Sequence, residues 1–259
     1  MTWTARVAAG RAGAEQVSAR RAVCVIVDAL RASATTAALL QAGAREIAVV
    51  EQVQEAFELA AVTPGAVLVG ERGGPKVPGF DLGNSPAGFP AEAVAGRTVV
   101  FSSSNCSRCC VGAREAAATF LGTVVTATAV TEALTRTVDQ GKEGAPEVVF
   151  VPAGSANDEA LLVPEDWFTC GLLLERLREA GVLPVGAEAE RALALWAEVG
   201  ERGLREAFAG TPNGTRLTAL GFGADVAACA ALDALQTVPR LRDSFSLPGG
   251  GAAAVLRSG

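Results

Sequence analysis

Short, uninterrupted apolar runs alternate with helix-compatible segments along this chain, and no other feature constrains its fold as strongly. The run Arg21–Asp28 (RAVCVIVD) ends in an acid and is followed by a helix-compatible stretch that reaches Gln41. Further runs at Ile47–Glu51 and Ala66–Gly70 enclose a helical segment at Gln52–Val62. Strands that are buried on both faces have such continuous apolar sequences. We therefore predict an α/β fold in three layers, with a mainly parallel or mixed sheet flanked by helices.

The same alternation continues toward the carboxyl terminus. It predicts strands at Thr98–Ser102, Thr123–Thr128 and Val148–Val151, and a turn at Thr211–Thr215. It also predicts a helix that follows Arg108 and ends at about Thr119, and further helices at Val130–Gln140, Trp167–Ala180, Ala187–Phe208 and Gly223–Leu235. The order of strand, polar turn with an arginine, and helix recurs weakly within the chain. We predict a single domain over residues 1–259, with two possible similar lobes at about 20–140 and 145–259.

Charge and composition narrow the class of partner. The net charge is −6, so the chain has no basic field that would attract nucleic acid. No apolar stretch approaches the roughly 18 residues of a membrane span, and the first residues lack the apolar block of a signal peptide. We expect a cytoplasmic protein with no nucleic-acid or membrane partner, and a possible homo-oligomer that packs through alanine-rich helices.

The absence of histidine excludes whole classes of reaction. A Ser-His-Asp triad, a phosphohistidine intermediate and a histidine-ligated pair of metal ions all need this side chain. Cys106 and Cys109 have the C-x-x-C spacing, but no second such pair is available to complete a zinc site. Chemistry must therefore come from carboxylates, cysteines, hydroxyls, arginines or the two lysines, and among these we expect the thiols to be reduced and dispensable.

Polar residues gather where the predicted strands end, which is where ligands bind in parallel α/β sheets. They are Asp28 and Arg31 after the first strand, Glu71 and Arg72 after the third, Asn105 and Arg108 after Thr98–Ser102, Glu165 and Asp166 before the helix at Trp167, and Asp81, Asn84 and Ser85 in the loop Glu71–Phe89. Structural roles stay open, because such acids also cap helices or form surface ion pairs. Asp225 is a weaker candidate for a metal ligand, because in its alanine-rich helix it could instead cap the helix or face solvent. The recurrence of acid and arginine at converging strand ends favours an anion-binding site.

Several segments in this order resemble the motifs of a known family. They are VDALRAS (Val27–Ser33), GERGG (Gly70–Gly74), GFDLGNSP (Gly79–Pro86), SSSNCSR (Ser102–Arg108), PED (Pro164–Asp166) and ADVAACAALD with a following VP (Ala224–Pro239). Together they resemble the 2-phosphosulfolactate phosphatases over nearly the whole chain, and GFDLGNSP is the most specific of them. The resemblance implies an α/β hydrolase that depends on Mg²⁺ and removes phosphate from 2-phosphosulfolactate in coenzyme M biosynthesis. The family motif usually has Gly-Thr after the asparagine, where this chain has Cys106 and Ser107. This difference affects the expected identity of the substrate more than the expected type of reaction.

Phosphoester hydrolysis needs charge neutralisation on the phosphoryl group and an oriented nucleophile, and these needs suggest roles for the candidate residues. The expected Mg²⁺ ligands are Asp28, Glu71, Asp81, Glu165 and Asp166, the arginine clamps are Arg31, Arg72 and Arg108, and the neutral donors to substrate are Asn84, Ser85 and Asn105. Asp28, Arg31 and Arg108 are the expected catalytic residues. A carboxylate serves either as base for an attacking water, which we favour, or as nucleophile. Three alternatives remain: a catalytically silent phosphometabolite-binding protein, a phosphatase of another small phosphoester, and a protein that acts by self-association.

Overall fold

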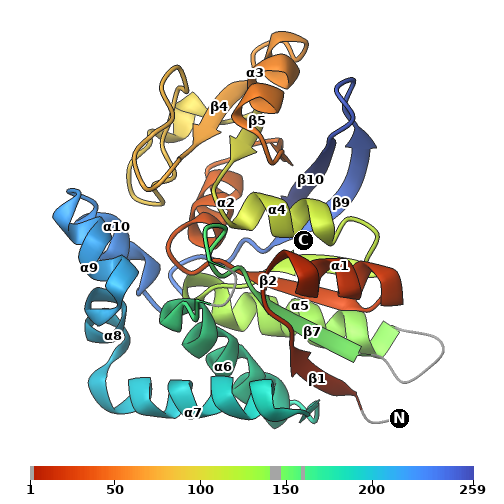
Figure 1. Ribbon diagram of the computed structural model, residues 1–259, viewed down its shortest axis with the longest axis vertical. Coiled ribbons are helices and arrows are strands. Elements are labelled where there is room, and N and C mark those ends of the chain that lie inside the picture. Colours follow the sequence, from red (N-terminus) through yellow and green to blue (C-terminus); the bar gives the residue numbers. More distant parts are fainter. Residues whose placement is uncertain (1–2, 141–146, 159–160) are drawn as a thin grey trace.

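The computed structural model describes residues 3–140, 147–158 and 161–259, and it contains one ten-stranded mixed sheet in the order β4-β5-β3-β10-β9-β6-β2-β7-β1-β8 (Figure 1). The strands are β1 Thr4–Val7, β2 Val23–Val27, β3 Glu46–Val49, β4 Val67–Gly70, β5 Thr98–Ser102, β6 Ala118–Leu121, β7 Glu147–Pro152, β8 Leu183–Pro184, β9 Pro239–Ser246 and β10 Ala252–Ser258. The helices are α1 Gly10–Arg20, α2 Ala32–Gln41, α3 Val53–Ala61, α4 Cys106–Gly112, α5 Ala127–Gln140, α6 Pro164–Glu179, α7 Ala187–Arg202, α8 Leu204–Gly210, α9 Pro212–Ala219 and α10 Gly223–Cys229.

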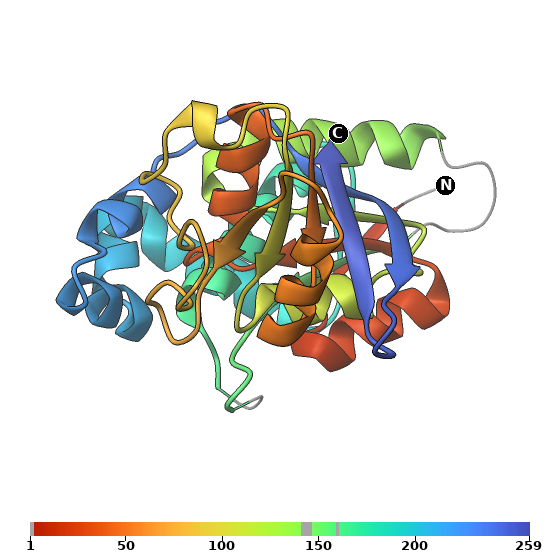
Figure 2. The same ribbon diagram turned by 90° about the horizontal axis from the view of Figure 1, so that it is seen from above.

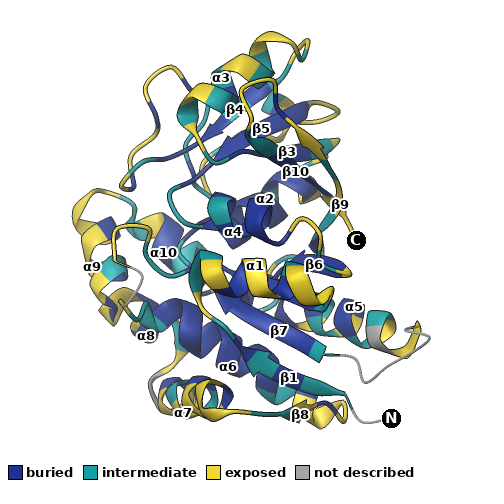
Figure 3. Cartoon of the chain, turned by 45° about the vertical axis from the view of Figure 1, so that its right-hand side comes forward, coloured by how far each residue is buried: buried dark blue, intermediate teal, exposed yellow. Residues whose placement is uncertain are grey.

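The central strand β2 shows why the sheet must be covered on both faces. All five of its residues are buried. Val25 and Val27 pack in one apolar cluster with α5 and α6, whereas Cys24 and Ile26 pack in another with α1 and α4. Successive side chains of a strand point to opposite faces, so a continuous apolar run fills two cores. Figure 2 shows α1 and α5 on opposite sides of the sheet, and Figure 3 shows β7 buried while α1 and α7 expose one side to solvent. The predicted three-layer α/β architecture is confirmed.

Two parallel blocks of strands form the sheet, and a hairpin joins them. The strands β3, β5 and β4 are parallel to one another, and so are β6, β2, β7, β1 and β8. Between the blocks, β10 pairs antiparallel with β3 and β9 pairs antiparallel with β6. The sheet is therefore mixed. Strands from both predicted lobes share it, since β2 pairs with β7 along its length, and the division into lobes stays a prediction.

One predicted strand and one predicted turn were wrong. The segment predicted as a strand at Thr123–Thr128 forms a 3-10 turn, Val124–Thr126, and the start of α5, whereas β6 lies just before it. Phe120 and Leu121 of β6 fill the cores on the two faces of the sheet. Their burial places the strand at these residues, although the β-branched residues that follow have the higher strand propensity. The segment predicted as a turn at Thr211–Thr215 begins α9, because the Thr211 hydroxyl accepts a hydrogen bond from the Gly214 backbone N–H at 3.0 Å.

Three predicted helices are shorter than expected. The helix predicted to reach Thr119 ends at Gly112, and the last helix ends at Cys229 instead of Leu235. The helix predicted over Ala187–Phe208 is two helices, because Gly203 adopts φ +77° between them. As a result α8, α9 and α10 fold into a group beside the loops that follow β2 and β4. None of the helices in the described chain is long and apolar enough to cross a membrane.

Candidate active site

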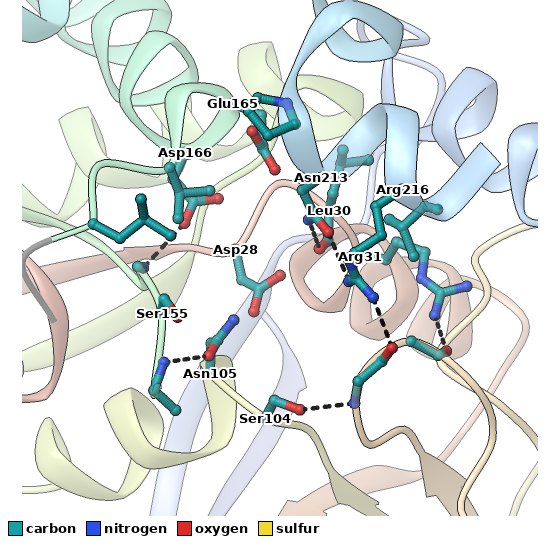
Figure 4. Close-up of a pocket in the computed structure, with 18 of the residues that line it drawn as sticks. Asp28, Leu30, Arg31, Ser104, Asn105, Ser155, Glu165, Asp166, Asn213 and Arg216 are labelled. Carbon is teal, nitrogen blue, oxygen red and sulfur yellow. Dashed lines mark hydrogen bonds between the residues drawn. The ribbon is translucent and has the colours of Figure 1, made fainter. Parts of the chain in front are cut away.

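A cavity of about 630 Å³ opens where β2, β4, β5 and β7 end (Figure 4). Eight of the residues predicted from sequence line it: Asp28, Arg31, Glu71, Arg72, Asn84, Asn105, Glu165 and Asp166. They come from loops that are far apart in the sequence, and the parallel strands bring them to one edge of the sheet. The convergence expected from the strand ends is therefore present for these residues.

Asp28 lies at the floor of the cavity and is 6% exposed. Its Oδ1 accepts a hydrogen bond from the Ala32 backbone N–H at 3.1 Å, and its Oδ2 accepts one from the Cys106 backbone N–H at 3.2 Å. The carboxylate thus joins the starts of α2 and α4. Burial raises the pKa of Asp28 to about 6, and the negative charges of Glu71 and Glu165 add to the rise.

Asp166, in the first turn of α6, is 3% exposed and is held in a similar way. Its Oδ1 accepts from the Ala29 backbone N–H at 2.8 Å, and its Oδ2 accepts from the Gly154 backbone N–H at 3.1 Å. Burial raises the pKa of Asp166 well above its usual range, followed by the charges of Asp28 and Glu165. Backbone amides therefore fix two carboxylates that repel each other on the floor of one cavity.

Glu165 differs from its neighbours because its carboxylate oxygens have no hydrogen-bond partner within the described part of the chain, although the residue is 0% exposed. Figure 4 shows it above Asp28, between Asp166 and Asn213. Burial raises its pKa, while the nearby polar groups of Asn213 and Thr211 oppose that rise. A buried carboxylate without partners is costly, and a cation or a hydrogen-bond donor in the cavity would relieve this cost.

Glu71 organises the loop after β4. Its Oε2 accepts from the Gly74 backbone N–H at 2.7 Å, and its Oε1 accepts from the Ser104 backbone N–H at 2.8 Å. These bonds tie the loop that follows β4 to the loop that follows β5. Arg72 extends the same connection, because its guanidinium donates to the carbonyls of Glu71 and Glu51 and to the Ser102 hydroxyl, at distances of 2.7 to 2.8 Å.

The guanidinium of Arg31 is held within the protein. Its Nη1 lies 2.5 Å from Asp225 Oδ2, and the side chains of this ion pair are 2% and 5% exposed. Its Nη2 donates to the Gly74 carbonyl, and the group lies 4.3 Å from the centre of the Phe222 ring. Arg31 therefore braces α10 and the loop at Gly74 against the floor, with its charge matched by Asp225.

Two amide side chains complete the wall of the cavity. Asn84 is 4% exposed, and its Oδ1 has no hydrogen-bond partner among the described residues. Asn105 Oδ1 accepts from the Ala156 backbone N–H at 2.9 Å, which connects the loop after β5 with the loop after β7. Asn84 therefore keeps an unused polar group at the cavity, whereas the side-chain oxygen of Asn105 is already engaged.

Comparison with known proteins identifies the family to which this site belongs. The family model for 2-phosphosulpholactate phosphatase matches residues 12–244. The chain belongs to the 2-phosphosulfolactate phosphatase family. It is 36% identical to a probable 2-phosphosulfolactate phosphatase of Carboxydothermus hydrogenoformans over 217 residues, which is 83% of this chain and 84% of the relative. It is 32% identical to a protein of the same description from Deinococcus radiodurans over 228 residues, 88% of this chain and 91% of the relative.

Three residues that sequence reasoning assigned to the site lie outside the lining of this cavity. Asp81, a predicted metal ligand, is exposed and accepts from the Leu68 backbone N–H at 2.8 Å, because its loop folds back along β4. Ser85 donates its hydroxyl to Asp225 Oδ1. Arg108, a predicted clamp, donates to the Ser155 carbonyl at 3.2 Å and borders a separate cavity of about 260 Å³.

Sequence reasoning missed Asn213, Arg216 and the true position of Asp225. Asn213 and Arg216 line the cavity from α9, in a segment whose Pro-Asn-Gly sequence favours a turn. Asp225 is 4% exposed and neither caps its helix nor faces solvent, because it pairs with Arg31. A lone acid in an apolar helix is a sign of a buried partner, and this signal could have identified it.

The positions at which this family member departs from the usual motif do not point into the cavity. Cys106 is buried, and its Sγ lies 3.8 Å from Cys110 Sγ, while its backbone N–H serves Asp28. The Ser107 hydroxyl accepts from the Ser103 backbone N–H at 2.9 Å. Both side chains are buried and neither belongs to the described lining of the cavity, so they lie beneath the site rather than in it.

The described part of the chain has no geometry suited to a cysteine phosphatase, in which a loop with a nucleophilic cysteine and an arginine six residues later binds phosphate. Cys170 and Arg176 have the C-x5-R spacing of cysteine phosphatases, but both lie within the regular helix α6. Cys170 is 0% exposed, and burial raises the pKa of its thiol. A helix interior cannot cradle phosphate with its backbone N–H groups, since these bond to the preceding turn.

Proposed function

We propose that this protein hydrolyses the phosphate ester of 2-phosphosulfolactate, giving sulfolactate and phosphate, with Mg²⁺ as cofactor. The observation that carries the proposal is the floor of the cavity, where buried carboxylates are fixed by backbone amides in a chain that belongs to this family. The names of the relatives support the substrate. We further propose, from the family and from the composition, a role in coenzyme M biosynthesis and a cytoplasmic location.

The charge of the cavity supports a cation. Asp28, Glu71, Glu165 and Asp166 line it, whereas the charge of Arg31 is matched by Asp225. Arg72 and Arg216 are then the lining arginines left to offset these acids and a polyanionic substrate. Carboxylates crowded in this way, with raised pKa values at three of them, favour either protonation or a bound cation.

The donor set suits a hard and partly hydrated ion. Among the described residues, no group of three or more acids or cysteines is arranged as a ready-made metal site. Mg²⁺ binds through one or two carboxylates, keeps several waters and takes substrate phosphate as a further ligand. One or two of the carboxylates of Asp28, Glu165 and Asp166 would hold it, and when bound it would neutralise charge on the phosphoryl oxygens.

The residues of the chain would then share the remaining work. The Ala32 and Cys106 amides hold Asp28 in one orientation, so its carboxylate keeps a fixed direction toward the cavity. With its pKa near 6 in the metal-free protein, Asp28 is ionised at neutral pH, so its carboxylate is available either to bind Mg²⁺ or to accept a proton from an attacking water. Arg72 also lines the cavity and offers positive charge to the substrate, while the unpaired Oδ1 of Asn84 is an acceptor that suits a hydroxyl, a water or the cation rather than an oxyanion.

Release of inorganic phosphate from 2-phosphosulfolactate, measured with and without Mg²⁺ after exhaustive chelation, tests the proposal. We expect activity only with Mg²⁺ or Mn²⁺, since carboxylate sites prefer hard cations. Asp28→Asn should lower kcat/KM by about 1,000-fold or more, which is roughly 4 kcal/mol. Asp139→Asn is the matched control, because Asp139 is an exposed residue of α5.

Each alternative predicts a different result. Full activity after chelation contradicts the role of Mg²⁺. Binding of 2-phosphosulfolactate without release of phosphate would identify a catalytically silent binding protein. Hydrolysis of another phosphorylated hydroxy acid, with none of 2-phosphosulfolactate, would assign the site to a different small phosphoester.

A further inference from the structure

The arginines that border the main cavity differ in how far their charge is already used. Arg31 is buried and paired with Asp225, and Arg72 is half-buried with three acceptors around it. Arg216 is exposed at the rim, and the oxygens to which it hydrogen-bonds within the described residues are neutral. Its Nη1 donates to the Gly73 carbonyl and its Nη2 to Asn213 Oδ1, each at 2.8 Å. The charge of Arg216 helps to lower the pKa of Glu165, but the guanidinium makes no hydrogen bond or ion pair with an acid among the described residues, so its positive charge is the one most available to an anion entering the cavity.

The position of Arg216 relative to the floor decides which part of a substrate it meets. Asp28, Glu165 and Asp166 are buried at the floor, whereas Arg216 reaches the cavity from α9, as Figure 4 shows. A phosphoryl group that reacts at the floor leaves the remaining groups of the substrate directed toward the rim. Two hydrogen bonds hold the guanidinium plane between the loop at Gly73 and Asn213, so little side-chain freedom is lost when it binds an oxyanion.

We propose that Arg216 determines substrate specificity by binding an anionic group of the substrate other than the phosphate. The chemistry is a planar guanidinium that binds an oxyanion, and the oxyanion is the sulfonate or the carboxylate of the substrate. The proposal rests on the proposed function, because it concerns the substrate bound at that same floor. Arg216 takes here part of the clamp role that sequence reasoning gave to Arg31, Arg72 and Arg108. It makes this contact equally in the ground state and the transition state.

Steady-state kinetics of Arg216→Gln on three substrates tests this. The substrates are 2-phosphosulfolactate, 2-phospholactate, which lacks the sulfonate, and glycerol 2-phosphate, which lacks both additional anions. We expect KM for 2-phosphosulfolactate to rise at least about tenfold while kcat stays within about twofold, the pattern of a lost uniform binding contact. The parameters for glycerol 2-phosphate should not change. An effect that persists with 2-phospholactate identifies the carboxylate as the partner, and an effect confined to 2-phosphosulfolactate identifies the sulfonate.

Two further variants separate binding from structure. Arg205→Gln, an exposed arginine of α8 in the same helical group, is the matched control and should leave all parameters unchanged. Arg216→Lys keeps the charge without the fork, and it should restore part of the lost affinity, which a purely structural role would not predict. It also serves if the glutamine variant fails to fold. An equal loss on all three substrates, or a fall in kcat with KM unchanged, overturns the proposal. Wild-type protein that releases no phosphate from 2-phosphosulfolactate contradicts the proposed function instead.

Discussion

The floor and the rim of the cavity differ in which elements supply their side chains. At the floor, Asp28 and Asp166 each follow or begin a regular element, and backbone amides of neighbouring loops fix both carboxylates. At the rim, α9 supplies Arg216, and behind it α10 supplies Asp225, which lies outside the cavity lining and pairs with Arg31; both residues contact loops more than 100 residues earlier in the chain. The comparison teaches that strand ends and helix starts bring the acids to one edge of the sheet, where loops distant in the chain hold them, whereas the rim depends on how the carboxyl-terminal helices pack.

The largest effect on stability should come from the rim. Asp225→Asn leaves the buried guanidinium of Arg31 without its countercharge, and removal of one partner of a buried pair costs about 3 kcal/mol or more. We expect the free energy of unfolding, measured by urea denaturation, to fall by this amount. The double variant Arg31→Met with Asp225→Leu should recover much of the loss, because no unpaired charge remains.

An exposed pair provides the control for this experiment. Glu132 pairs with Arg136 on α5 at 3.8 Å, and both side chains are more than half exposed. Glu132→Gln should change the free energy of unfolding by no more than about 0.5 kcal/mol. If Asp225→Asn proved no more costly than this control, the ion pair would not be what holds the rim against the floor.

Removal of a charge from the floor should increase the free energy of unfolding, in contrast to its effect at Asp225. Glu165→Gln eliminates a buried carboxylate without partners, so in the presence of a chelator the variant should be more stable than wild type by about 1 kcal/mol. Because burial raises the pKa of Glu165 in the folded state, the wild type loses stability as pH rises above the unfolded value of 4.5. The advantage of the variant should therefore appear above that pH and vanish below it.

Thermal denaturation between pH 4 and 8, with chelator and then with Mg²⁺, measures this effect. Added Mg²⁺ should stabilise the wild type by binding the folded state and should stabilise Glu165→Gln less. Glu206→Gln, an exposed residue of α8, is the control. A variant that lost stability at every pH, or that gained as much from Mg²⁺ as the wild type, would show that the Glu165 carboxylate is neither strained nor a ligand.

The smallest effect is expected at Arg108. This residue was predicted from sequence to clamp the phosphoryl group, but it borders the smaller cavity behind Ser155. Arg108→Lys should therefore keep kcat and KM within about twofold of the exposed control Arg136→Lys, whereas Arg216→Lys should not. Steady-state kinetics of the three variants decides between them. A tenfold loss confined to Arg108→Lys would restore the clamp and place the substrate nearer the smaller cavity.

The sequence by itself determined the layers of the fold and most of the floor. A continuous apolar strand such as Val23–Val27 must be covered on both faces, and parallel strands must end at a common edge, so Asp28, Glu71 and Asp166 converge. These inferences hold because neighbouring residues identify the strand or helix that each acid follows or begins, although the amides that hold Asp28 and Asp166 come from loops up to 137 residues away. The motifs that resemble the family include these same acids, and the family model matches residues 12–244.

Only the tertiary structure decided the hairpin between the two parallel blocks and the composition of the rim. The strand β9 is partly exposed along much of its length, so its sequence lacks a strong apolar pattern. Asp225 could be assigned only once α10 was packed against Arg31, and Asp81 was removed from the site by a loop that folds back along β4. The physical reason is that the free energy of each decisive contact depends on how the chain around it packs, whether the contact joins distant residues, as for Asp225 and Arg31, or closes a loop, as for Asp81 and Leu68.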